Sequence, residues 1–568
     1  MMRKHIFRLA IVTISTLIAS FHASAASAAD LAVPAATAVN WDGVYGGIQG
    51  AIAAGSASWS SPAGYFASER GQGVPPDVAG KGQQNGLLGG LQLGYNRQFG
   101  AYVLGLEADA SFGPLDGYAV CGGTVGLEAP ETDPYQRGSG DPCHVSTNWL
   151  ASATGRFGYA FGRVLAYAKG GMAFAGDRYD IYNPTAFSAN PAQGNAGLFG
   201  WTLGAGLEYA LGGNWSVKAE YDYYDFGTRT IGFNVPGYLG FNSFSIRRYE
   251  NLAKFGLNYR FADTGGGDVS APAPAIVSDF TGEFGGRLGI SSGRFREHLY
   301  SNFNGAQLVS RLTWPDQTGV SLESFARADH ISGLFAKGDF GGIDLFGAHM
   351  NDEDFPPDHY PYSNTLSPTY RGRDLYASAD LGYSFLRANT WSLGGFVGYH
   401  YYSERMNAYG LTQQAPQSST SKNTLFEPNS AITLGQTEYW QALRVGLGGD
   451  VMLTDRLKLY AEAVWLPYMS YTGKDNHWLR ANINPQYDYG QGYNGFQTEA
   501  VLSYALTDRI NVGVGARYWD FRAQRSSSQF PGALGRSPEG ISSSRTGGFL
   551  QASYKFGDVA AAPVVAKY

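Results

Sequence analysis

Two short clusters of ionisable side chains have the residue types and the spacing of a hydrolytic site. They are the runs Asn351-Asp352-Glu353-Asp354-Phe355 and Lys474-Asp475-Asn476-His477-Trp478. We expect them at the outer ends of two strands of one sheet, directly after stretches in which polar and apolar residues alternate. Because residues i and i+2 of a strand point to one face, Asp352 pairs with Asp354, and Asp475 pairs with His477.

The two pairs together could activate a water molecule. If they face each other across the mouth of a barrel, His477 would take a proton from the water as a general base. Asp475 would orient the imidazole and make it more basic, while Asp352 and Asp354 would hold the water from the other side. Each pattern alone also fits a solvated acidic turn with an exposed histidine, so the rest of the chain has to decide between these interpretations.

Residues 43–261 alternate in the manner of strands that cross a membrane. In the segment 215–221, apolar and polar side chains take opposite faces, so one face suits lipid and the other a polar lumen. Such segments lie near 43–56, 84–98, 101–113, 146–161, 163–176, 198–211, 214–228 and 245–261. The connections are tight around Gly100, Gly162 and Gly212-Gly213 and long at 57–83, 114–145, 177–197 and 229–244. This asymmetry is typical of a bacterial outer-membrane barrel.

The alternation resumes after residue 281 with longer strands. They are expected near 282–299, 307–329, 334–350, 372–386, 391–408, 438–453, 457–472, 494–507, 510–522 and 546–556. Strands longer than the ~9–11 residues that cross a bilayer predict a barrel that stands above the membrane. The expected fold is therefore all-β, with two tandem antiparallel transmembrane β-barrels of eight and then ten strands.

The composition agrees with a barrel and excludes other classes. Only 15% of the 568 residues are charged, 14% are aromatic and 78 are glycine. Beyond the first twenty or so residues, no run approaches the ~18 apolar residues that a spanning helix needs. The net charge of -6 gives no reason to expect a nucleic acid as partner.

The remaining segments predict that the protein is secreted and that a linker separates the two barrels. Residues 1–29 have basic residues, an apolar stretch and then small residues, as in a signal peptide. The first barrel would occupy 30–261, a Gly/Pro linker 262–280, the second barrel 281–556 and a tail 557–568. Cys121 and Cys143 share one loop, and they are either bridged or free thiols.

The first half resembles the eight-stranded porin-like surface-antigen family of outer-membrane barrels. The resemblance rests on the segments 41–47, 94–96, 105–109, 155–159, 206–209, 218–221 and 256–261. It implies a structural or surface-exposed barrel and gives no catalytic motif to transfer. The first barrel is therefore expected to be non-catalytic.

The second half resembles the omptin family of outer-membrane proteases. Its landmarks, in order, are the segments 293–300, 310–314, 352–354, 394–399 and 475–477. The resemblance implies an endopeptidase with a groove at the extracellular top, water as nucleophile and no metal. It assigns the catalytic groups to Asp352, Asp354, Asp475 and His477, with Phe355 where the family usually has tryptophan.

The resemblance also predicts a substrate pocket with less negative charge than is usual in the family. Glu297 matches the acidic residue that receives the side chain before the cleaved bond, which favours arginine or lysine there. A second acid of the family is replaced by Gly473, and Lys474 follows it. We therefore expect cleavage after basic residues with modest selectivity, and we expect Gly473→Asp to sharpen it.

The expected activity is thus that of an outer-membrane endopeptidase acting on polypeptides at the cell surface, without a metal or other cofactor. Its surroundings would be outer-membrane lipids, and the family implies activation by lipopolysaccharide bound to basic side chains outside the barrel. The segment 400–405 does not reproduce the family's spacing of acidic and basic residues, which leaves that dependence open. The alternative is a non-catalytic surface, adhesive or structural barrel protein.

Overall fold

The computed structural model describes residues 39–60, 80–120, 142–181, 192–212, 214–233, 242–261, 280–301, 307–356, 362–415, 426–478, 484–531 and 535–557. Within these ranges no helix is long and apolar enough to span a membrane. The predicted signal peptide lies outside the described residues, as do almost all of the predicted linker and tail. These three assignments stay predictions.

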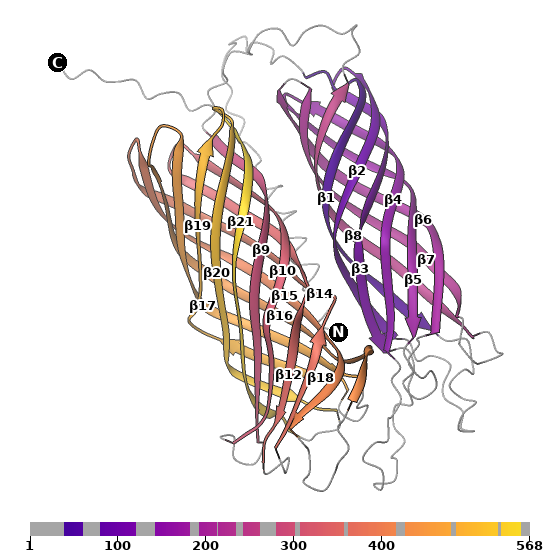
Figure 1. Cartoon of the computed structure of the whole chain (residues 1–568). Helices are drawn as coiled ribbons and strands as arrows, with labels where there is room; N and C mark the ends of the chain where they lie inside the picture. The colour runs from indigo at the N-terminus through magenta and orange to yellow at the C-terminus, as the bar shows by residue number, and fades with distance from the viewer. Residues whose placement is uncertain are drawn as a thin grey trace. The chain divides into compact units, whose positions relative to one another are not determined.

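The first sheet is an eight-stranded closed barrel, as predicted (Figure 1). Its strands are β1 (Gly43–Ser60), β2 (Gly80–Phe99), β3 (Tyr102–Val120), β4 (Pro142–Phe161), β5 (Val164–Ile181), β6 (Ala192–Gly212), β7 (Trp215–Phe233) and β8 (Asn242–Phe261). Each strand pairs antiparallel with its neighbours, and β1 closes the ring on β8, where Val44 lies opposite Phe261. The closure leaves no unpaired strand edge for lipid to meet.

The second sheet contains thirteen strand segments that make ten passes. They are β9 (Phe280–Tyr300), β10 (Leu308–His330), β11 (Leu334–Leu345), β12 (Ala348–Asp354), β13 (Ser363–Thr369), β14 (Gly372–Arg387), β15 (Trp391–Ala415), β16 (Phe426–Met452), β17 (Leu457–His477), β18 (Gln486–Gly492), β19 (Gly495–Ala505), β20 (Ile510–Gln529) and β21 (Ser537–Phe556). Three passes consist of two segments each, namely β11 with β12, β13 with β14, and β18 with β19. The pairing of β15 with β16 closes this ring, and the predicted fold class is confirmed.

Tight turns fix one end of each barrel. In the second barrel, the hydroxyl of Thr454 accepts hydrogen bonds from the backbone N–H groups of Arg456 and Leu457. Thr507 makes the same contacts with the two backbone N–H groups at 509 and 510. In the first barrel, Gly100 and Gly162 take left-handed conformations, with φ of 62° and 59°, that side chains with a Cβ disfavour. The turns at Gly100 and Gly162 lie at their predicted places.

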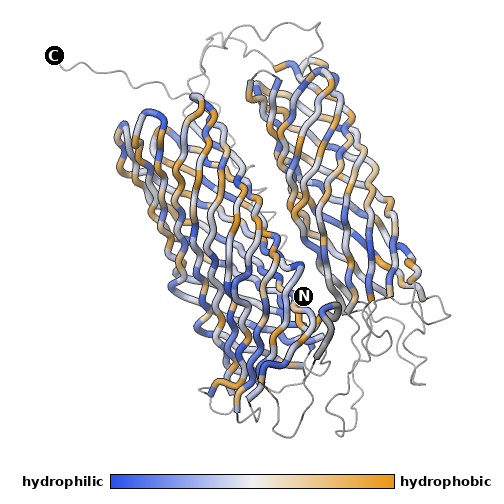
Figure 2. The backbone as a smooth tube through the Cα atoms, in the orientation of Figure 1, coloured by the Kyte–Doolittle hydropathy of each residue, from blue (hydrophilic) through white to orange (hydrophobic). Residues whose placement is uncertain are grey.

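An apolar belt surrounds the tight-turn half of the second barrel. Hydrophobic and hydrophilic residues alternate along the strands of both barrels in Figure 2. On β9 the last large exposed apolar side chain before the long-loop end is Ile290, and on β17 it is Tyr468. Glu297 and Asp475 each lie seven residues further along, which corresponds to roughly 20 Å of strand. The long-loop end of the barrel therefore rises above the lipid.

The predicted strands end too early on the side of the long loops, and this error affects the predicted positions of the site residues. Asp352 and Asp354 lie inside β12, and Asp475 and His477 lie inside β17, whereas we expected both pairs after their strands. The segments β13 and β18 are also absent from the prediction. Above the lipid, both faces of a strand meet polar surroundings, so the alternation that reveals a strand fades there.

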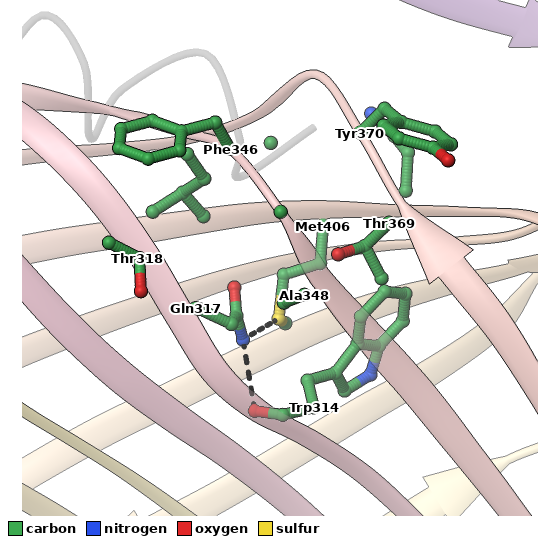
Figure 3. Close-up of a pocket in the computed structure, with 12 residues that line it drawn as sticks. Trp314, Gln317, Thr318, Phe346, Ala348, Thr369, Tyr370 and Met406 are labelled. Atoms are coloured by element: carbon green, nitrogen blue, oxygen red, sulfur yellow. Dashed lines mark hydrogen bonds between the residues drawn. The ribbon is translucent and has the colours of Figure 1, made fainter.

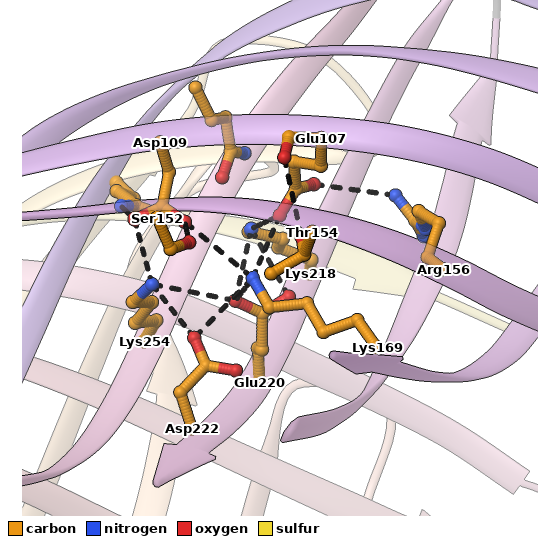
Figure 4. A network of polar contacts seen from close by, with 12 residues as sticks. Glu107, Asp109, Ser152, Thr154, Arg156, Lys169, Lys218, Glu220, Asp222 and Lys254 are labelled. Atoms are coloured by element: carbon orange, nitrogen blue, oxygen red, sulfur yellow. Dashed lines mark hydrogen bonds and ion pairs between the residues drawn. The ribbon is translucent and has the colours of Figure 1, made fainter. Parts of the chain in front are cut away.

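Ionic side chains fill the lumen of the first barrel (Figure 4). Lys254 donates to Asp109 at 2.9 Å and forms an ion pair with Asp222 at 2.7 Å. Lys169 pairs with Glu107 and Glu220 at 2.9 and 2.8 Å. All of these side chains are almost fully buried, so the lumen at this level is packed with protein atoms and does not form an open channel.

Cys143 belongs to the buried core of the first barrel and is disulfide-bonded. Cys121, the other cysteine of the chain, lies outside the described residues.

Cutting the chain between the barrels should leave two folded units. Each sheet closes on itself, so neither needs a strand from the other to complete its hydrogen bonds. A protease site inserted between Phe261 and Phe280 should release two fragments, and each should migrate differently on a gel before and after boiling. The chain without the inserted site is the control. A fragment that unfolds as soon as it is released would contradict the independence of the two barrels.

Candidate functional site

Asp475 and His477 form a close couple at the outer end of β17. The Nε2 atom of His477 lies 3.3 Å from Oδ2 of Asp475 and 3.3 Å from the amide oxygen of Gln486 on β18. The Asp475 side chain is almost fully buried, whereas the His477 side chain is 19% exposed. The predicted i, i+2 pairing therefore brings these two side chains together, and the imidazole stays partly accessible to solvent.

Asp352 and Asp354 point toward the interior of the same barrel. In the ladder of β10 and β12, Asp352 lies opposite Leu312, whose side chain is part of the barrel core. Directly opposed residues of an antiparallel pair share a face, so Asp352 faces the lumen, and Asp354 does so as well. The intervening Glu353 takes the other face, where it pairs with Arg311 at 2.6 Å.

Glu297 connects the two halves of the site. It lies opposite Leu312 in the ladder of β9 and β10, so two strand spacings, roughly 10 Å, separate its backbone from that of Asp352. Its carboxylate accepts hydrogen bonds from Gln436 at 2.7 Å and from Gln486 at 3.2 Å. These two glutamines lie opposite Asp475 on the strands at either side of it. Through these two glutamines, Glu297 is connected to the Asp475 and His477 couple.

Three further acids converge beside Glu297, and the sequence did not predict them. Glu438 on β16 and Asp488 on β18 both lie opposite Gly473, which has no side chain to separate them. Glu539 on β21 brings a carboxylate oxygen within 4.8 Å of those of Glu297 and Asp488, a spacing that suits the ligands of a cation. All of these side chains are buried. We call Glu297, Glu438, Asp488 and Glu539 the acidic pocket.

Burial sets the protonation behaviour of the acidic pocket. Loss of hydration is the largest cause, and it raises the pKa of each of the four carboxyl groups above its ordinary value. Mutual repulsion adds to this effect, because Asp488 and Glu297 raise the pKa of Glu438 and of Glu539. Glu297 and Glu539 are close enough to share a proton. These carboxyl groups therefore keep their protons to higher pH than free carboxyl groups do.

The acidic pocket changes the expectation that one carboxylate is missing. An added Cβ at Gly473 would lie 2.5 Å from Oε2 of Glu438 and 3.0 Å from Oδ2 of Asp488. The space of the missing acid is thus already occupied by two others. Lys474 takes the opposite face of β17, because the lumen-facing positions there are Gly473 and Asp475. Its charge therefore lies on the face away from the acids, and the strength with which the pocket binds a basic side chain stays a prediction.

A separate small cavity lies in the wall of the second barrel, where β11 gives way to β12 (Figure 3). Gln317 donates to the sulfur of Met406 at 2.8 Å within it, and Trp314 forms part of its lining. Its volume of about 10 Å³ is enough for about one water molecule. Its lining contains none of the predicted catalytic residues, so it is not part of the candidate site.

Each of the two barrels matches a known protein family. Residues 23–261 match the outer membrane protein beta-barrel domain, and residues 282–532 match the Omptin family. These matches confirm both predicted resemblances and place the protein in the outer membrane. No curated protein sequence matches the chain.

Three solved structures illustrate the similarity to known barrels. The outer membrane protease OmpT of Escherichia coli is 15% identical, with a TM-score of 0.43, over 49% of this chain and 97% of that one. Neisserial surface protein A (NspA) is 13% identical, with a TM-score of 0.18, over 38% of this chain and 97% of that one. A FadL homologue of Pseudomonas aeruginosa is 10% identical, with a TM-score of 0.17, over 91% of each chain.

Proposed function

We propose that this outer-membrane protein, whose second barrel matches the Omptin family, is a surface endopeptidase that hydrolyses peptide bonds with an activated water molecule. The observation that carries the proposal is the couple of Asp475 and His477, held 3.3 Å apart at the open end of that barrel. The first barrel has no role in the chemistry. It is a packed structural or surface-exposed domain.

The chain's own residues suffice for the proposed reaction. Asp475 and Gln486 both present oxygen atoms to Nε2 of His477, which favours the tautomer with its proton on Nε2 and its lone pair on Nδ1. Nδ1 then takes a proton from the water while the water oxygen attacks the peptide carbon. Asp352 and Asp354 hold this water from the β12 side. When the C–N bond breaks, the protonated imidazole returns the proton to the leaving amine.

The acidic pocket supplies the substrate preference in this proposal. A basic side chain before the cleaved bond would enter between Glu297 and the acids around Gly473. The proposed substrates are therefore polypeptides with exposed basic residues at the cell surface. No metal takes part in the proposed steps, and activation by lipopolysaccharide stays a prediction.

Cleavage by intact cells tests the proposed function. Cells that carry the full-length chain in their outer membrane should cleave a quenched fluorescent peptide with a single internal arginine, and a chelator should not abolish this activity. Cells with the same amount of the Asp475→Asn variant are the control, because the variant keeps the side-chain shape and lacks the charge. Equal cleavage by both cell types would mean that the activity does not come from this site, and the non-catalytic alternative would then hold.

A further inference from the structure

The wall of the second barrel is interrupted at one level in three neighbouring passes. Residues 346–347 separate β11 from β12, and residues 370–371 separate β13 from β14. On β10, the ladder with β9 shifts register between Trp314 and Gln317. Leu345, the last residue of β11, lies opposite β10 on one side and opposite the first residue of β14 on the other. The three interruptions therefore lie side by side.

Each interruption contains a residue with a left-handed backbone. The angle φ is 52° at Asp316, 65° at Gly347 and 54° at Arg371. Regular strands do not contain this conformation, and residues with a Cβ adopt it at a cost. The small wall cavity lies at the same level, so the packing there is incomplete as well (Figure 3). The regular wall therefore ends at this line.

Beyond the interruption, β12 and β13 form a two-stranded segment that we call the arm (Ala348–Asp354 with Ser363–Thr369). All seven residues of β12 pair with β13. The ladder of the arm with β10 extends only from Ser310 to Thr313, and its ladder with β15 shifts register twice. The arm is thus paired more completely within itself than with either neighbour.

The inner face of the arm is mostly polar. Met350 is the only large apolar side chain that the arm, all of which the structure describes, adds to the core. The other side chains on this face beyond Ala348 are carboxylates and hydroxyls: Asp352, Asp354, Ser363, Thr365, Ser367 and Thr369. Segments that bury little apolar surface open more readily than the rest of a protein. We therefore expect the arm to move more easily than β9, which pairs with the same residues of β10.

Asn407 on β15 holds the base of the arm. Its side-chain Nδ2 donates a hydrogen bond to the backbone carbonyl of Arg371 at 3.1 Å. Its own backbone carbonyl accepts a hydrogen bond from the N–H of Tyr370 at 3.3 Å. The residue is only 3% exposed, so water cannot easily replace the amide. Asn407 thus contacts both residues of one interruption.

We propose that the arm turns as a unit about Gly347 and Arg371 and that Asn407 fixes its working position. The two aspartates that hold the attacking water in the proposed function lie on the arm, whereas the imidazole lies on β17. The distance between them therefore depends on the angle of the arm. A misplacement of ~1 Å can lower a rate about 100-fold. The proposal rests on the proposed function and adds three positioning residues to it.

Exchange of backbone amide hydrogens tests whether the arm moves. The refolded full-length protein in detergent micelles is transferred to deuterated buffer, and its segments are followed by mass spectrometry. We expect the arm to exchange at least about tenfold faster than residues 296–299 of β9, which pair with the same residues of β10. Asn407→Ala should accelerate the arm about tenfold further and leave residues 296–299 unchanged. The matched control is Asn511→Ala, which removes another buried asparagine at the tight-turn end of the same barrel.

Two substitutions of Gly347 test the joint itself. An added Cβ at this position would meet no atom within 4 Å, so a side chain acts there only through the backbone conformation. Valine disfavours a φ of 65°, whereas asparagine tolerates it. On the peptide with a single internal arginine, Gly347→Val should lower kcat at least about tenfold with little change in KM, and Gly347→Asn should keep most of the rate. The matched control is Gly100→Val in the first barrel, where φ is 62° and a Cβ would also meet no atom within 4 Å.

The outcomes separate the arm from the proposed function. Exchange of the arm as slow as that of residues 296–299 would overturn the proposal, whether or not any peptide is cleaved. Unchanged kcat in folded Gly347→Val would also overturn it, since the arm would then have no part in positioning the water. If Gly347→Val does not fold, Asn407→Ala takes its place, with the same expected fall in kcat. If the folded, unmodified chain cleaves no peptide, the proposed function fails, and the exchange rates alone decide whether the arm turns.

Discussion

His477→Ala is expected to lower the rate of peptide cleavage by at least about 100-fold, because it removes the proposed general base. Asp475→Ala should have a similar effect, since the imidazole would lose the carboxylate that lies 3.3 Å from its Nε2 atom. Both variants should still fold, because these residues lie above the apolar belt at the open end of β17. Initial rates on the arginine peptide measure the effect, and gel mobility before and after boiling reports folding.

The matched control for this pair is His330→Ala. His330 is a histidine at the tight-turn end of the same barrel, where it contacts Ser332 at 2.8 Å. Its replacement should leave the rate unchanged. Full turnover in folded His477→Ala would show that the catalytic assignment carried over from the family is wrong.

Lys254→Ala should destabilise the first barrel by about 3–5 kcal/mol. Lys254 is fully buried and contacts Asp109, Asp222 and the hydroxyl of Tyr224 at 2.7 to 2.9 Å. Its removal leaves two carboxylates in the lumen without this cation. The free energy of unfolding is measured by urea titration of the chain with the inserted protease site. After equilibration in urea, the protease cuts the chain between the two barrels. The gel band of each barrel then gives the folded fraction of that barrel.

A surface ion pair provides the control for this effect. Arg247 is about half exposed and pairs with Asp225 at 2.8 Å, so Arg247→Ala should change stability by no more than about 1 kcal/mol. Peptide cleavage by the second barrel should survive Lys254→Ala. An unfolding curve of Lys254→Ala that equals that of the unmodified chain would mean that the lumen network does not hold the first barrel together.

The parts of the fold that could be predicted from the sequence are those in contact with lipid. There each strand must present apolar groups outward and polar groups inward, as in the alternation of Lys218, Glu220 and Asp222 with apolar neighbours. The tight turns at Gly100 and Thr454 have residue types that their geometry requires. The outer segments β13 and β18 are rich in Ser, Thr, Asn, Gln and Tyr, and no lipid imposes a pattern on them.

The site, too, could be predicted only in part, because some of its contacts join residues close in sequence and others join residues on different strands. Asp475 and His477 lie two residues apart on one strand, so their pairing follows from strand geometry alone. The meeting of Glu438 with Asp488 depends on the register of β16, β17 and β18, in which both oppose Gly473. A single sequence gives neither the register of β18 on β17 nor the register shift in the ladder of β16 and β17 between Leu443 and Val445. For this reason the sequence indicated a missing acid, whereas the structure shows that two others occupy its place.

The catalytic role of the Asp475 and His477 couple is tested by the initial rates at which the purified, refolded full-length chain and its His477→Ala variant cleave a quenched peptide with one internal arginine. Mass analysis then identifies the products. We expect a single cut directly after the arginine by the unmodified chain and a rate at least about 100-fold lower for the variant. No cleavage by the folded, unmodified chain, or equal cleavage by both proteins, would contradict it.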